Sequence, residues 1–218
     1  LIKHNGPVNN LTKFNKILKI DTFKNKINFK NSPSLEAQVA SISDDIAYNN
    51  HDLEDGLRAN LFKIKNLKSL PIVSNLVKKH YKNISAYRNE IIINQIVREL
   101  INKMVLDVIK TTKKNLKKFK LRTINDIHSH DRPIVEFSSL MKKVDKQIKD
   151  FLMHKMYNHK MVIVNTNKRK KIIKYLFDYL IKKPNKFIYR NSLNNKKKER
   201  AVADFIAGMT DRYAINLY

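Results

Sequence analysis

The feature that most constrains the fold is a long stretch of periodic apolar residues within Ile84–Lys120. Apolar side chains recur there at four-residue steps, at Ile92, Ile96, Leu100, Met104 and Val108. A second row runs beside the first, at Ile93, Val97, Ile101 and Val105. These steps place the side chains on one side of an α-helix, and two adjacent rows indicate a helix that is largely buried. The rest of the chain must therefore cover this helix.

The other periodic stretches also predict helices. Three of them show apolar residues at helical spacing, at Ser138–Lys160, at Asn165–Lys183 and from about Lys198 to the end. The last is marked by Val202, Phe205, Ile206, Met209 and Tyr213. No run alternates apolar and polar residues as a half-buried strand would, and the three glycines form no Walker or dinucleotide loop. We therefore predict an all-α fold.

The large positive charge of the chain leaves two explanations open. Lys and Arg number 45 against 19 Asp and Glu, which gives a formal net charge of +26. Such an excess attracts polyanions, but Lys, Asn and Ile are abundant together, which also indicates an AT-rich coding sequence. The densest run of lysines, within Lys110–Lys120, ends the predicted long helix. There we expect a solvated helix end favoured by the helix dipole, rather than a polyanion site.

Two further properties of the sequence indicate the redox compartment and whether a membrane is involved. The chain has no cysteine, so it has no disulfide and no thiolate metal site, which fits a reducing, cytoplasmic compartment. No apolar run approaches the roughly 20 residues of a membrane-spanning helix, so we expect no membrane partner.

An acidic window, Ser32–Asn60, interrupts this basic chain. It contains no lysine and six acids. We predict a helix with Ser32 as N-cap, Pro33 in the first position and an apolar stripe at Leu35, Val39, Ile42 and Ile46. The opposite face carries Ala37, Ser41, Asp44, Tyr48 and Asp52. This face is either a functional row or only the solvated side of an amphipathic helix.

Three segments resemble one known family. DDIAYNNHDLEDGLRA at Asp44–Ala59, IKHNGPV at Ile2–Val8 and ERAVADFIAGMTDRYAINLY at Glu199–Tyr218 are similar to segments of the deoxyguanosinetriphosphate triphosphohydrolase-like family of the HD superfamily. The resemblance implies an HD-domain helical bundle, of which residues 1–120 would form the C-terminal part. Residues 121–218 would form a helical phosphohydrolase-associated region.

The resemblance also implies an activity and a site. The family reaction is metal-dependent hydrolysis of a deoxynucleoside triphosphate to the deoxynucleoside and triphosphate. By resemblance, Asp44 is the catalytic, final metal ligand, Tyr48 packs against the deoxyribose, and Asp52 accepts a hydrogen bond from the 3′-hydroxyl. Lys3 resembles a lysine near the substrate phosphates. The implied cofactor is a divalent ion, Mg²⁺, Mn²⁺ or another transition metal.

The missing ligands lead to a further expectation. The remaining ligands of the family, a His and a His-Asp pair, should lie upstream of Leu1, and the chain does not begin with Met. We therefore expect a fragment that is inactive alone. Family members also lead us to expect a homo-oligomer and a nucleic-acid or nucleotide effector. The alternative function is a basic, helical nucleic-acid-binding protein without catalysis, which would carry Lys and Arg on one continuous face.

One motif imitates a metal site. His128, His130 and Asp131 stand in the order HSHD, but Pro133 follows closely and biases Arg132 away from helix. Because an HD dyad requires rigid helical placement, we do not assign the metal to this segment.

Overall fold

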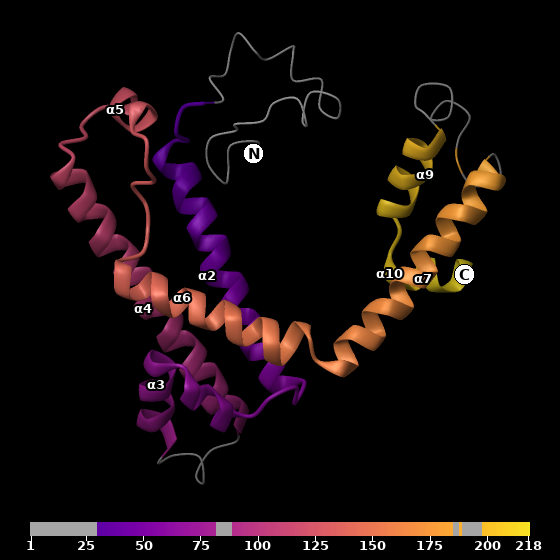
Figure 1. The fold of residues 1–218 in the computed structure, drawn as a ribbon, viewed down its shortest axis with the longest axis horizontal. Coiled ribbons are helices and arrows are strands. Elements are labelled where there is room, and N and C mark those ends of the chain that lie inside the picture. Colours follow the sequence, from indigo (N-terminus) through magenta and orange to yellow (C-terminus); the bar gives the residue numbers. More distant parts are fainter. Residues whose placement is uncertain (1–29, 82–88, 185–187, 189–197) are drawn as a thin grey trace. The chain divides into compact units, whose positions relative to one another are not determined.

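The computed structural model describes residues 30–81, 89–184, 188 and 198–218 (Figure 1). Every regular element in these residues is helical, which confirms the predicted all-α class. The chain divides into two compact units, residues 1–156 and 157–218, and each is described by itself. None of the helices that the structure describes combines the length and apolar content needed to cross a bilayer.

The first unit is built around one long helix. Its elements are α2 (Leu35–Arg58), the 3-10 helix η2 (Ile64–Ser69), α3 (Pro71–Tyr81), α4 (Asn89–Lys118), α5 (Ile124–Ser129) and α6 (Ser139–Leu152). Helix α4 packs against α2 and α3, and α2 also packs against α6 (Figure 1). Helix α2, which carries Asp44, Tyr48 and Asp52, thus packs against both α4 and α6.

Burial along α4 follows the predicted stripe only in part. Ile92, Ile96, Leu100 and Met104 are fully buried, as the four-residue steps predict. Val105 is 38% exposed, so the second row leaves the core halfway along the helix. The first row continues to Val108, which is 9% exposed, whereas Leu106 and Ile109 are 56% and 45% exposed. The prediction of a buried side is therefore correct for the first row and wrong for the second row beyond Met104.

Helix α2 begins two residues later than predicted. Ser34 is the N-cap and its hydroxyl accepts a hydrogen bond from the N–H of Ala37 at 3.4 Å. Ser32 has another role, because its hydroxyl donates to the carbonyl of His130 at 2.6 Å. The predicted apolar stripe is also incomplete, since Val39 is 48% exposed. The covered side at this end of α2 is lined instead by Gln38, which binds the segment at Ile134.

The second unit packs two short helices on a longer one. Helix α7 (Lys160–Lys182) contacts α9 (Lys198–Ala207) and α10 (Asp211–Leu217). The core of this unit contains Leu180, Ile188, Ala201 and Val202. The prediction of a single C-terminal helix is wrong. Thr210 caps a second helix, since its hydroxyl accepts a hydrogen bond from the N–H of Tyr213 at 3.2 Å.

The boundary between the two units differs from the predicted division into residues 1–120 and 121–218. The predicted helix Ser138–Lys160 ends at Leu152, and one π-helical turn, Met153–Tyr157, follows it. Compact units and sequence families are defined by different criteria, so the predicted domain division stays a prediction.

Candidate functional site

The predicted row of three side chains lies on one face of α2. Asp44, Tyr48 and Asp52 stand four residues apart, which is a rise of about 6 Å per step along a helix. Asp44 is exposed, Tyr48 is 64% exposed and Asp52 is half-buried. Each step also turns by about 40° around the helix axis. The helix therefore carries a carboxylate, a phenol and a second carboxylate along a slowly winding row, which can contact an elongated polar ligand at three points.

The described residues do not by themselves form a metal site. Among them, no group of three or more His, Cys, Asp or Glu side chains is placed to hold an ion. Asp44 can supply carboxylate oxygens, which suit hard divalent ions, but one carboxylate does not complete a coordination shell. Any such ion would need further ligands from outside the described residues.

A polar network fixes α2 against α6 beside this row. The amide of Asn49 donates to Asp145 at 2.8 Å, and the ammonium of Lys149 lies 2.9 Å from the same carboxylate. Lys149 also lies 3.6 Å from Asp45, the neighbour of Asp44. The network thus draws the carboxylate of Asp45 toward Lys149 of α6.

The protonation of Lys149 agrees with this arrangement. Partial burial alone would lower the pKa of Lys149, but the hydrogen bond and charge of Asp145, with a smaller contribution from Asp45, raise it above its ordinary value. Lys149 therefore stays charged between these two carboxylates. Sequence reasoning missed this network, although the spacing of Asp145 and Lys149 by four residues was a usable signal.

The start of α2 is fixed by a second set of polar contacts. The side-chain oxygen of Gln38 accepts hydrogen bonds from the N–H groups of Ile134 at 2.8 Å and Val135 at 3.1 Å. Its amide nitrogen donates to the carbonyl of Pro33 at 3.0 Å. Gln38 is only 6% exposed, so these contacts are shielded from water. They fix the segment after α5 against α2.

The HSHD segment contributes to packing. A ring nitrogen of His128 lies 2.8 Å from the carbonyl oxygen of Ser32, and the ring of His130 packs on Phe119 with centroids 4.6 Å apart. Asp131 is exposed. The segment is also more regular than expected for a loop, because Thr123 caps the short helix α5.

Two further residues of the segments discussed above differ in whether the structure describes them. Arg58, at the end of α2, donates hydrogen bonds to Glu54 and Asn94, both at 2.8 Å. Lys3 lies outside the described residues. The structure thus places Asp44, Tyr48 and Asp52 on one face of α2 but does not test their roles.

Comparison with known proteins shows which proteins this chain is similar to. A model of the phosphohydrolase-associated domain matches residues 135–218. Three relatives, each named deoxyguanosinetriphosphate triphosphohydrolase-like protein, are similar over 100% of the chain. The relative from Pelagibacter ubique is 49% identical over 217 residues, those from Bartonella henselae 35% over 233 and Rickettsia typhi 36% over 226. The chain spans 57–58% of the length of these relatives.

Proposed function

We propose, from the premise that this chain belongs to the family of deoxyguanosinetriphosphate triphosphohydrolase-like proteins, that the complete protein hydrolyses deoxynucleoside triphosphates. The observation that carries the proposal is the similarity of the whole chain to relatives of that name. The products would be a deoxynucleoside and intact triphosphate. The row of Asp44, Tyr48 and Asp52 on α2 supports this proposal. Its three side chains differ in chemistry in the order that a sugar and its phosphates would require.

In this proposal each residue of the row meets one part of the substrate. Tyr48 packs its ring against the deoxyribose and leaves no room for a 2′-hydroxyl. Asp52 accepts a hydrogen bond from the 3′-hydroxyl. Asp44 stands at the phosphate end and supplies one oxygen ligand to a divalent ion. Tyr48 is 64% exposed and Asp44 is exposed, so these two side chains face solvent, whereas Asp52 is half-buried.

The proposed cofactor is Mg²⁺, Mn²⁺ or another divalent transition metal. Since the described residues alone do not complete a coordination shell, we assign only Asp44 to it. The other ligands would come from the part of the relatives' length that this chain does not span. Lys3 stays proposed as a contact of the substrate phosphates, and a homo-oligomeric, cytoplasmic enzyme also stays part of the proposal.

The test uses the complete protein and measures triphosphate release. Asp44→Ala should abolish activity, whereas Asp52→Ala should specifically lose recognition of the 3′-hydroxyl. A site built to bond a hydroxyl can reject the analogue that lacks it by roughly 10⁴, so the parent should strongly prefer deoxynucleotides over dideoxynucleotides. That ratio should shrink in Asp52→Ala, and Tyr48→Ala should relax the exclusion of ribonucleotides.

A matched control separates recognition from general damage to α2. Glu36→Ala removes an exposed carboxylate from the first turn of the same helix and should leave both substrate ratios unchanged. If Asp52→Ala and Tyr48→Ala also left both ratios unchanged, the row would be only the solvated side of α2. If the complete parent protein released no triphosphate at all, the proposed function itself would be wrong.

A further inference from the structure

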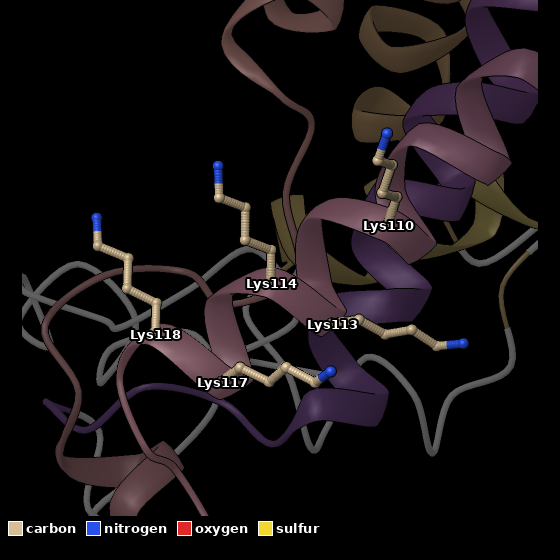
Figure 2. A pocket seen from close by; sticks show the side chains of 5 residues that line it. All are labelled: Lys110, Lys113, Lys114, Lys117 and Lys118. Carbon is tan, nitrogen blue, oxygen red and sulfur yellow. The ribbon is translucent and has the colours of Figure 1, made fainter.

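Five exposed lysines gather on the second half of α4. They are Lys110, Lys113, Lys114, Lys117 and Lys118, named here the α4 lysine face. Together they line one open stretch of the surface of the first unit. Figure 2 shows that Lys110, Lys114 and Lys118 extend to the same side, with Lys113 and Lys117 in a second row beside them.

The geometry of α4 makes this face long and continuous. The eight-residue step from Lys110 to Lys118 rises about 12 Å, and at about 100° per residue the five side chains occupy an arc of about 140°. The face is therefore a ridge of five ammonium groups with open surroundings. It lacks the walls that a pocket for a small molecule needs in order to orient one ligand.

The five lysines are not neutralised by the protein. In the described part of the chain none of them makes an ion pair, and Lys118 only lies over the ring of Phe119 at 5.2 Å. Other lysines of the same unit do have acidic partners, such as Lys79 with Glu99 and Lys149 with Asp145. The α4 lysine face is thus a local excess of positive charge beyond the general basic character of the chain.

Helix stability does not explain the arrangement. Cations near a helix C-terminus are favoured by the helix dipole, but this effect falls off within the last turn, which contains only Lys117 and Lys118. Lys110, Lys113 and Lys114 lie further in. Like charges at i, i+4 destabilise a helix, and Lys110 with Lys114 and Lys113 with Lys117 have this spacing. The helix dipole therefore accounts for two of the five lysines, and the expectation of a merely solvated helix end leaves the other three unexplained.

We propose that the α4 lysine face binds the phosphate backbone of a nucleic acid. Several ammonium groups at successive steps along a ridge match a polymer of phosphates better than a single nucleotide. A lipid surface fits less well, because Leu106 is the single exposed large apolar residue of α4 that falls within the arc of the face, whereas Val105 and Ile109 point about 100° or more away from its centre. The proposal depends on charge and geometry alone and does not rest on the proposed hydrolase activity.

The test measures binding of a fluorescent single strand of about 20 thymidine nucleotides to the complete protein by anisotropy. Replacing all five lysines by Gln should lower the affinity at least about tenfold at about 50 mM salt. The slope of log affinity against log salt should also become shallower by about 0.7 for each lysine that contacts a phosphate. Replacing the five lysines by Arg keeps the charge and should keep the binding.

The control removes the same charge elsewhere in the first unit. Lys65, Lys78, Lys103, Lys143 and Lys146 are exposed, and the structure shows no ion pair for them with a described residue. Replacing these five by Gln should leave affinity and salt slope near the parent values. Equal losses in both variants would mean diffuse attraction by net charge, and no loss in the α4 variant would place binding elsewhere; either result overturns the proposal. So would equally tight, lysine-dependent binding to phosphatidylserine vesicles.

Discussion

At the scale of single residues, the first unit depends on polar side chains that the sequence presents as surface residues. Gln38 and Asn49 are 6% and 5% exposed. No apolar pattern could have predicted their burial, because amides normally face water and become buried only where partners satisfy them. Those partners, such as Ile134 for Gln38 and Asp145 for Asn49, lie about 96 residues away in sequence. Hydrophobic periodicity carries no information about contacts of this kind.

Gln38 gives a direct test at this scale. Gln38→Leu keeps the size of the side chain but leaves the N–H groups of Ile134 and Val135 buried without their acceptor. Each buried, unsatisfied group costs about 1–3 kcal/mol, so the free energy of unfolding should fall by about 2–6 kcal/mol. Urea unfolding of the chain measures this. Gln147→Leu, at an exposed position of α6, should change it by no more than about 0.5 kcal/mol. A loss that small for Gln38→Leu would contradict the described contacts.

At the scale of elements, the predictions succeeded where apolar periodicity meets a real neighbour. The steps through Ile92, Ile96 and Leu100 placed α4 and its buried side correctly. The predictions failed where a capping residue decides where a helix begins or ends, or where no neighbouring element that the structure describes covers the apolar side chains. Ser34 rather than Ser32 caps α2, and Thr210 starts a new helix inside a stretch whose apolar spacing continues. The exposure of Tyr48 and Asp44 follows from the period of α2, but their roles do not.

The α4 lysine face also predicts an effect on the stability of its own helix. Lys110→Gln with Lys114→Gln removes the i, i+4 repulsions between Lys110 and Lys114 and between Lys114 and Lys118. Each such pair is worth about 0.2–0.5 kcal/mol, so the double variant should be more stable by about 0.4–1 kcal/mol at low salt. The gain should shrink at high salt, because salt screens exposed charges. Urea unfolding at both salt concentrations measures it, with the isolated substitution Lys103→Gln as control. A loss of stability at low salt would show that these lysines support the fold.

At the scale of the whole molecule, the chain carries only part of the proposed catalytic apparatus. Asp44 is the single metal ligand assigned to it, and the described residues form no cluster that could hold an ion. The 218-residue chain alone should therefore release no triphosphate above the blank with Mg²⁺ or Mn²⁺. The complete protein, assayed in parallel, is the positive control, and a helical circular dichroism spectrum must show that the chain is folded. Turnover by the folded chain would mean that other residues build the site.

The match to the phosphohydrolase-associated domain begins at residue 135, inside the first compact unit, whereas the second unit begins at Tyr157. The early part of the matched region includes Val135 and α6, which bind Gln38 and Asn49 of α2. This region is consequently not an interchangeable module. A chimera joined at residue 135 would replace Asp145, the side-chain partner of the buried Asn49, while a junction in the turn Met153–Tyr157 would keep the two residues together. Gln38 depends less on the foreign sequence, because it binds backbone N–H groups. The sequence of α6 is thus tied to that of α2 through Asp145 and Asn49.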